Sequence, residues 1–363
     1  MIRTCFFALL LTLSLNIGAQ TFTPERTAGI YYAYPVTESA RVCPEGYTPF
    51  YISHYGRHGS RWLPSEERYT WVMAWFVDKG KLTSFGKSVR SRLKKICANA
   101  LGHAGALTPL GATQHRGIAR RMVLRYPEVF ASCPVDSFPD DTRILARSST
   151  SPRCRASMLA FCEQLNSFSP LSPRSSFTIE TRPEDMAYIN YESPELKALS
   201  ARTQRQPAIS TDRFLAALFK DPAAISPADA LKLLSELHTI ASDIQDIPLD
   251  ISLWDCFTPE EMQAVHDANN ERMTLINGDT IVNDGIAARS SIALWQNIVA
   301  EADSMIVSGG RGASLRFGHD TALFRQLTLL QLQLPSTNME DIVPMAANLQ
   351  MVFFRGEGCE VSG

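Results

Sequence analysis

Residues 50–62, FYISHYGRHGSRW, join a β-like run to a loop that carries two histidines, two arginines and two glycines. The run from Phe50 to Ser53 predicts a buried strand that ends at the glycine-bearing loop. Within the loop, His58 stands between Arg57 and Arg61. Because neighbouring cations repel one another, this clustering predicts that a negatively charged group binds among them.

The composition limits the role of this cation cluster. The chain has 363 residues, is 45% hydrophobic and carries a formal net charge of −2. This length suits one large domain or two joined domains with a sizeable core. General nucleic-acid binding requires a basic face, so we expect no nucleic-acid partner. The arginines of the loop therefore serve a local purpose.

The N-terminus has the pattern of a secretion signal. Arg3 supplies the positive charge, Phe6 to Leu15 is a short apolar run, and Ile17-Gly18-Ala19 precedes a cleavage point before Gln20. Residues 1–19 are therefore predicted to be a signal peptide, which implies a secreted or periplasmic protein. No other stretch predicts a membrane span, so we expect no stable membrane anchor. The oligomeric state stays open.

The cysteines favour neither a zinc site nor a redox site. Outside the predicted leader they are Cys43, Cys97, Cys133, Cys154, Cys162, Cys256 and Cys359, and no Cys-x-x-Cys pair occurs. An oxidising compartment permits some of them to pair, and their odd number leaves at least one unpaired within the chain. Their spacing does not give the connectivity.

Strands and helices alternate along most of the chain. LTPLGATQHRGIARRMVLRYP, residues 107–127, predicts a helix in which Thr108 is the N-cap and Pro109 lies in the first turn. The stretch from Arg143 to Arg147 predicts a second strand, and a helix is expected from Pro152 to Leu165. Further strands are predicted at 313–318, directly before His319-Asp320, and at 350–355.

Residues 167–283 differ from the rest of the chain in sequence pattern. A turn-rich segment is followed there by short amphipathic stretches. We therefore predict a layered α/β core, residues 20–166 and 284–363, with a mainly helical cap inserted at 167–283. The predicted strands deliver Arg57-His58, Arg147 and His319-Asp320 just past their carboxyl ends. In open α/β sheets this edge binds ligands.

These side chains suit phosphoryl transfer. The guanidinium groups of Arg57, Arg61 and Arg147 match phosphate oxygens and stay charged. The imidazole of His58 is the predicted nucleophile, which forms a phosphohistidine and splits one difficult step into two. Asp320 is the predicted proton donor, and His319 is predicted to bind a phosphate oxygen. The arginines lower the pKa of His58 and bound phosphate raises that of Asp320, so we expect an acidic to near-neutral optimum.

A metal site is a weaker interpretation of the same loop. His54 and His58 are four residues apart, but this spacing forms a metal pair only on a helix. The preceding strand and the glycines indicate a different conformation, so no metal and no cofactor is predicted. SGGRG, residues 308–312, lacks the lysine and the context of a P-loop, and we interpret it as a turn.

The chain resembles the histidine acid phosphatases, the branch-2 histidine phosphatases. RHGSR at 57–61 is similar to their RHGxR motif and FGHDTAL at 317–323 to their distal His-Asp motif. Residues 107–122 and 146–161 resemble the helix after the first strand unit and the segment that supplies a third arginine. The four segments are in family order. The resemblance implies His58 as nucleophile, Asp320 as proton donor, phosphate contacts from Arg57, Arg61, Arg147 and His319, and a small-molecule phosphate ester as partner. It also implies a Rossmann-like, phosphoglycerate mutase-like α/β/α core with an α-helical cap.

Within that family, residues 151–161 and 253–262 look most like multiple inositol polyphosphate phosphatases, which implies phytate and lower inositol phosphates as substrates. Two features depart from this pattern. The proline that often follows the first motif comes later here, as the last residue of Trp62-Leu63-Pro64. The distal motif reads His319-Asp320-Thr321 instead of His-Ala-Glu, so its acid is placed as in ordinary acid phosphatases. The chain also ends at Gly363, soon after a predicted core strand, so a fragment or a short variant is expected.

Three other functions remain under consideration. The alternative within the family is a broad acid phosphatase for small phosphate esters. A protein that only binds phosphate esters needs neither a nucleophile nor an acid, so His58 and Asp320 disfavour it. A sugar-phosphate mutase shares the Arg-His-Gly start, but the predicted signal peptide and His319-Asp320 argue against it.

Overall fold

The computed structural model describes residues 10–11, 23–36, 43–130, 142–168, 176–332 and 339–356. The strands are β1 (Leu10–Leu11), β2 (Tyr47–Arg57), β3 (Thr142–Ser148), β4 (Ser176–Glu180), β5 (Arg311–Gly318) and β6 (Asn348–Gly356). The helices up to α7 are α1 (Glu66–Trp75), α2 (Ser84–Ala100), α3 (Pro109–Arg125), α4 (Pro127–Phe130), α5 (Pro152–Phe168), α6 (Met186–Ile189) and α7 (Pro194–Arg202). Those that follow are α8 (Asp212–Leu218), α9 (Pro227–Asp243), α10 (Pro259–Asn277), α11 (Ile286–Arg289), α12 (Ile292–Val307), α13 (Asp320–Leu329) and α14 (Met339–Ile342).

The strands form one sheet in the order β1-β6-β2-β5-β3-β4. Strand β2 pairs in parallel with β5, which pairs in parallel with β3, and β4 continues this direction. Strand β6 runs antiparallel to β2, and the two-residue β1 runs antiparallel to β6. Parallel neighbours bring their carboxyl ends to one edge, so the α/β sheet predicted from the sequence is confirmed.

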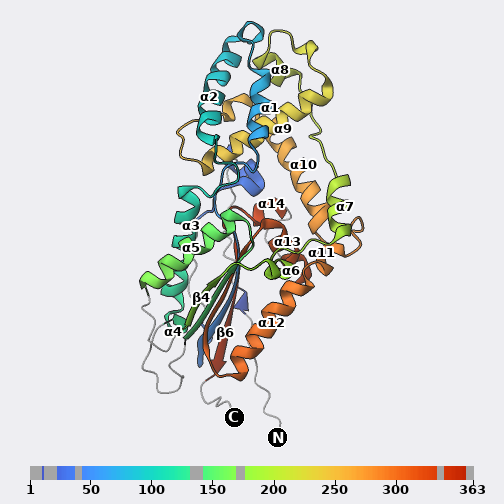
Figure 1. Ribbon diagram of the computed structural model, residues 1–363. Coiled ribbons are helices and arrows are strands. Elements are labelled where there is room, and N and C mark those ends of the chain that lie inside the picture. The colour runs from blue at the N-terminus through green and yellow to red at the C-terminus, as the bar shows by residue number, and fades with distance from the viewer. Residues whose placement is uncertain are drawn as a thin grey trace.

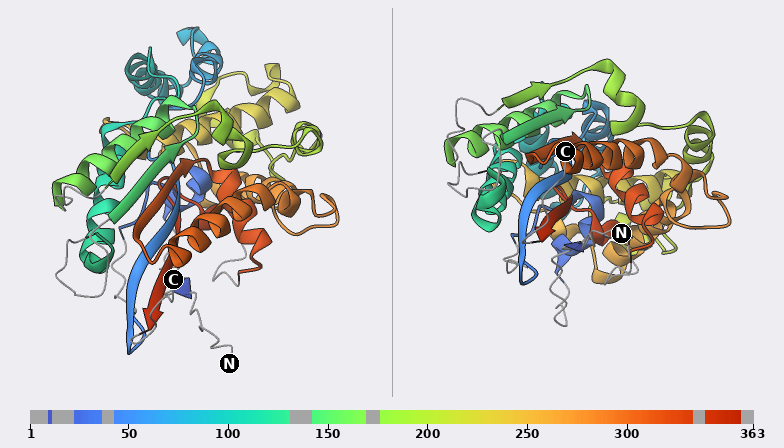
Figure 2. Two further views of the ribbon diagram at one scale, coloured as in Figure 1. Left: turned by 60° about the horizontal axis from the view of Figure 1, so that its bottom comes forward. Right: turned by 90° about the horizontal axis from the view of Figure 1, so that it is seen from below.

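Helices cover both faces of this sheet (Figures 1 and 2). One face packs Ile52, Ile144 and Leu315 against α3, α4 and α5. The other face packs Tyr55 and Leu349 against α12 and α13. Successive side chains of a strand point to opposite faces, so each central strand is buried on both sides. The core is therefore a three-layer α/β/α arrangement, as expected.

Helix α3 begins as its sequence predicts. The Thr108 side chain accepts a hydrogen bond from the backbone N–H of Gly111, and Pro109 occupies the first helical position. The helix buries Ile118 and Met122 against the sheet. These local signals place the start of α3 beside the loop that follows β2.

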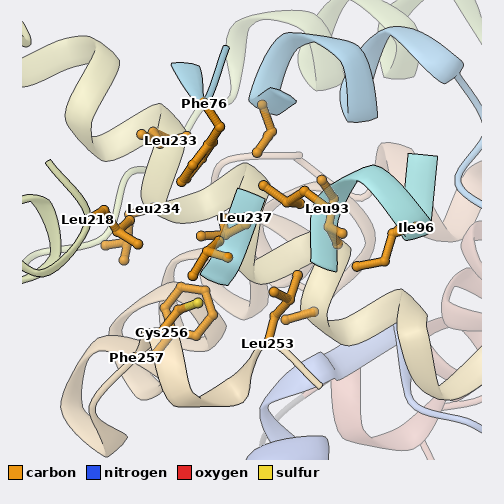
Figure 3. Packing of buried hydrophobic residues seen from close by; sticks show 14 of the residues in the cluster. Phe76, Leu93, Ile96, Leu218, Leu233, Leu234, Leu237, Leu253, Cys256 and Phe257 are labelled. Atoms are coloured by element: carbon orange, nitrogen blue, oxygen red, sulfur yellow. The ribbon is translucent and has the colours of Figure 1, made fainter. Parts of the chain in front are cut away.

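The helical cap does not have the boundary that the sequence predicted. Helices α1 and α2, which we assigned to the core, pack with α8, α9 and the start of α10 in a separate apolar cluster (Figures 1 and 3). The reason is that α2 buries one face, with Leu93 and Ile96, in this cluster, where it contacts α1 and α8. Helix α9 contributes Leu233 and Leu237 to the same cluster. Along the sequence, the cap is thus built from two segments, one before and one after the core strands β3 and β4.

Conversely, part of the predicted cap lies with the core. Helix α6 contacts α12 and β5, and α7 contacts α10 and α11. Helix α10 runs from the cap, where Val265 is buried, to the core, where Met273 is buried. It begins with a capping box between Thr258 and Glu261. This helix joins the two apolar clusters within one element.

The described cysteines Cys43, Cys97, Cys154, Cys162 and Cys256 are free thiols. The expected leader lies outside the described residues except for β1, and Cys133 and Cys359 also lie outside them. None of the helices in the described ranges combines the length and apolar character that a membrane span requires.

Two histidines are buried within the core. His54 on β2 packs 5.3 Å from the Phe161 ring, and His115 on α3 packs 5.7 Å from the Phe317 ring. Burial lowers the pKa of His115 to about 3, and burial together with the neighbouring His115 and Arg316 lowers that of His54 to about 3. The unfolded chain binds their protons near the usual pKa of 6.5, so stability present above that pH is lost as the pH falls toward 3.

We therefore expect acid to destabilise the fold by about 2 kcal/mol per histidine between pH 7 and pH 5. Urea unfolding at both pH values measures this loss. His115→Leu replaces one of the titrating rings and is expected to reduce the loss by about 2 kcal/mol. An equal loss of stability in wild type and His115→Leu would show that other groups govern acid unfolding.

Candidate active site

The site lies where β2 and β5 end side by side. The register pairs Arg57 with Gly318, so the next residues of the two strands, His58 and His319, are neighbours. The backbone N–H of His58 donates to the Gly318 carbonyl at 3.0 Å, and the two imidazole centroids are 5.7 Å apart. Parallel pairing thus brings the two sequence motifs together at the carboxyl edge of the sheet.

One nitrogen of the buried His58 ring is already occupied. Its Nδ1 lies 2.9 Å from the Gly59 carbonyl oxygen, which can only accept a hydrogen bond. In the neutral ring the proton therefore resides on Nδ1, and Nε2 keeps its lone pair. Burial, followed by the charges of Arg57, Arg61 and Arg153, holds the pKa of His58 well below 6.5. The ring is thus neutral and suited to nucleophilic attack through Nε2.

Arg57 is fixed by groups from both ends of the chain. Its side chain is fully buried, and Nη1 donates to the carbonyl oxygens of Ile30 at 2.6 Å and Val343 at 2.7 Å. Its Nη2 lies 3.1 Å from Oδ2 of Asp320. A guanidinium held at these points has a defined orientation, which phosphate recognition requires.

Arg61 lies against the 3-10 segment η1 (Pro24–Tyr31). Its guanidinium carbon is 5.3 Å from the centroid of the Tyr31 ring, and Nη1 donates to the Trp62 carbonyl at 3.0 Å. The Tyr31 hydroxyl accepts from Arg68 at 3.0 Å. An aromatic face leaves the edge of the guanidinium available to oxygen ligands, so η1 acts as one wall of the site.

His319 and Asp320 occupy the start of α13. His319 Nε2 is 3.2 Å from the Ser149 hydroxyl, and its backbone N–H donates to the Tyr55 hydroxyl at 3.1 Å. Burial, together with the charge of Arg153, lowers the pKa of His319 to about 4. For Asp320, burial acts to raise the pKa, but Arg57 and His319 outweigh it and the net pKa is lowered. In the empty site Asp320 is therefore a carboxylate.

Arg147 is not part of this cluster. Its guanidinium pairs with Glu301 of α12 and lies 3.8 Å from Glu180. The alternation of β3 explains this position: Ile144 and Ala146 face α3 and α5, so Arg147 points to the opposite face of the sheet. The prediction that Arg147 contacts phosphate therefore disagrees with this geometry.

Arg153 lies where Arg147 was expected. It is the second residue of α5, and its Nη2 is 3.4 Å from Nδ1 of His319. Its charge is also among those that lower the pKa of His58. The site thus contains three arginines, but the third comes from the first turn of a helix instead of the end of a strand.

Gly59 lies against the start of α3. A Cβ at this position would lie 2.6 Å from the carbonyl oxygen of Gly111, and a Cβ at Gly111 would lie 2.3 Å from that of Ser60. Both glycines are therefore required for the close contact between the catalytic loop and the start of α3.

Comparison with protein-family models and with curated protein sequences found no match. Solved structures do match. The multiple inositol polyphosphate phosphatase of Bifidobacterium longum, in complex with inositol hexasulfate, gives a TM-score of 0.69 at 16% identity, covering 92% of this chain and 88% of that chain. The chain has the fold of this phosphatase.

Two phytases share the fold at similarly low identity. The phytase from D. castellii gives a TM-score of 0.66 at 14% identity and covers 92% of this chain and 77% of that chain. The Hafnia alvei phytase in complex with tartrate gives 0.52 at 15% identity, with 86% and 83% covered. The histidine acid phosphatase fold that the motifs predicted is therefore confirmed.

Within this phosphatase fold, sequence reasoning missed Arg153, Tyr31 and Ser149. Arg153 could have been identified from the sequence. The alternation of side chains along the strand places Arg147 on the opposite face from Ile144 and Ala146, which leaves Arg153 as an alternative. Tyr31 and Ser149 carry no local signal, since they join the site only through the tertiary packing of η1 and of the loop after β3.

Proposed function

We propose that the chain is a metal-independent phosphomonoesterase that acts through a phosphohistidine intermediate. One observation supports this proposal. The His58 ring lies close to the His319-Asp320 pair, and the charges of three arginines act on it: Arg57, Arg61 and Arg153. Buried cations around a neutral imidazole fit a phosphoryl group, because oxyanion stabilisation and in-line positioning dominate phosphoryl transfer.

In the proposed first step, Nε2 of His58 attacks phosphorus while the arginines and His319 bind the non-bridging oxygens. The bond from phosphorus to the ester oxygen breaks, and the carboxylic acid of Asp320 protonates the departing alkoxide. In the second step, the Asp320 carboxylate takes a proton from water, which attacks phosphorus. The phosphorus–nitrogen bond then breaks, which releases inorganic phosphate and regenerates neutral His58.

Inositol polyphosphates such as phytate are the proposed substrates. Support comes from the likeness to the Bifidobacterium longum phosphatase, which is described with inositol hexasulfate, and to the phytase from D. castellii. The position of Asp320 directly after His319 supports a second candidate, a broad acid phosphatase for small phosphate esters. The ratio of phosphate release from phytate to that from p-nitrophenyl phosphate distinguishes the two.

The direct test is phosphate release by the purified protein with and without a chelator. We expect release that is insensitive to the chelator. Loss of activity with chelator, restored by a divalent cation, would contradict the metal-independent mechanism. The absence of release from either substrate would contradict the phosphatase assignment.

The pH dependence tests the role of Asp320. Since Arg57 lowers the pKa of Asp320 in the empty site, its proton-donating form is lost as the pH rises. We expect kcat/KM for phytate to fall above the acidic range, and Asp320→Asn to lower kcat by about a hundredfold or more and to remove this decline.

A leaving group that needs no proton provides the control. p-Nitrophenolate departs without general acid catalysis, so Asp320→Asn is expected to lower kcat/KM for p-nitrophenyl phosphate much less than kcat/KM for phytate. This parameter isolates departure of the leaving group, because hydrolysis of the phosphohistidine is common to both substrates and follows that departure. Equal losses of kcat/KM on both substrates would exclude Asp320 as the proton donor.

We also propose that residues 1–19 are a signal peptide and that the protein is secreted or periplasmic. Removal of these residues would remove β1 and leave β6 as the sheet edge. N-terminal sequencing of the exported protein tests this, with Gln20 expected as the first residue.

A further inference from the structure

The loop that carries His58 and Arg61 is held from the cap by two buried acids. Asp246 ends the 3-10 segment η5 (Ile244–Asp246), and its Oδ1 accepts a hydrogen bond from the Ser60 hydroxyl at 2.5 Å. Asp243, at the end of α9, accepts from the Tyr69 hydroxyl at 2.9 Å. Tyr69 in turn accepts from the backbone N–H of Leu63 at 3.0 Å. These contacts fall on either side of Arg61.

Every polar group of Ser60 has a partner from another element. Its N–H donates to the Gln114 side-chain oxygen at 2.9 Å, and its hydroxyl accepts from the Gln114 amide nitrogen at 2.7 Å. Its carbonyl accepts from the N–H of Thr108 at 2.9 Å and from the Thr108 hydroxyl at 3.0 Å. With Gln114 donating to the hydroxyl, the hydroxyl hydrogen is directed at Asp246. Asp246 is thus the contact through which the cap fixes Ser60.

We propose that Asp246 is a positioning residue that acts through Ser60 to hold His58 and Arg61 in their reactive geometry. The inference rests on the proposed phosphatase function. A side chain between a nucleophile and a phosphate-binding arginine transmits any displacement to both, and misplacement by about 1 Å can lower a rate about a hundredfold. Both Ser60 and Asp246 are fully buried, so removal of the acceptor leaves the Ser60 hydroxyl hydrogen without its protein partner.

A neutral acid suits this position. Burial raises the pKa of Asp243 to about 7 and raises that of Asp246 well above its ordinary value, with the Asp243 charge raising the latter further. In the acidic range both groups are then protonated and do not repel the phosphate that binds beside Arg61. Hydrogen-bond acceptance by Asp246 therefore matters more than its charge.

Three variants separate positioning from simple stability. Asp246→Ala removes the acceptor, and we expect kcat to fall about tenfold or more and the Kd for inorganic phosphate to rise. Asp246→Asn keeps a carbonyl oxygen as acceptor for Ser60. We therefore expect its kcat and its Kd for inorganic phosphate to stay close to the wild-type values. Glu261→Ala is the matched control, because buried Glu261 bonds Arg213 and caps α10 within the same cap. It is expected to lower the Tm while leaving kcat and Kd unchanged.

Wild-type kcat and Kd in Asp246→Ala, with only a lower Tm, would overturn the inference. Equal impairment of Asp246→Asn and Asp246→Ala would also overturn it, since hydrogen bonding alone would not explain the loss. If the wild type releases no phosphate, the proposed function fails, and calorimetry of inorganic phosphate binding still decides the role of Asp246.

Discussion

Arg153→Ala is expected to lower kcat/KM by about a hundredfold or more, whereas Arg147→Ala leaves it within about threefold. Arg153 lies 3.4 Å from His319 and contributes to the low pKa of His58, so its loss removes a cation from the proposed phosphate site. Arg147 pairs with Glu301 on the opposite face of the sheet. Initial rates with phytate and with p-nitrophenyl phosphate measure both variants.

The paired variants also control for folding. Glu301 keeps its second partner, Arg316, when Arg147 is removed, so Arg147→Ala is expected to reduce stability without unfolding the chain. Arg153→Lys retains the charge but not the planar fork, and is expected to recover only part of the activity. Strong loss in Arg147→Ala with wild-type rates in Arg153→Ala would restore the assignment made from the sequence alone.

His58→Ala is expected to abolish turnover, with a loss in kcat of about 10⁴-fold or more, because no other described group takes the place of its Nε2. Trapping provides a sharper measurement than rate alone. Phosphohistidine survives alkali and is destroyed by acid, so wild-type protein quenched with base during turnover should carry phosphate on the peptide that contains His58. The variant should carry none.

The exposed His103 provides the matched control. His103→Ala removes an imidazole that stacks on Trp62, and its phosphorylation and kcat are expected to match the wild type. Phosphate trapped on any residue other than His58, or turnover by His58→Ala near the wild-type rate, would refute the proposed nucleophile.

Much of the core was predictable because its signals are local. The N-cap at Thr108, the proline that follows it, and the apolar runs that became β3 and β5 depend only on nearby residues. Strand β2 extends through Arg57, beyond the run that ended at Ser53 in our interpretation, because Gly56 pairs within the sheet instead of turning the chain.

The features that could not be predicted from the sequence depend on which surfaces pack together in the fold. The apolar face of α2 fits a sheet or another helix equally well, and only its packing with α1 and α8 assigns it to the cap. Likewise, Asp243 and Asp246 look like surface acids of an amphipathic helix, and only the fold places them beside Ser60 and Tyr69. The face of Arg147 was an exception, since strand alternation already determined it.

The pairing of β2 with β5 has a consequence for the order of synthesis. Tyr51 pairs with Gly312, and Arg57 donates to the carbonyl of Val343, which lies 286 residues further along the chain. Contacts so distant along the chain form late and slowly. A nascent chain therefore leaves both edges of β2 unpaired until β5 and β6 have been synthesised.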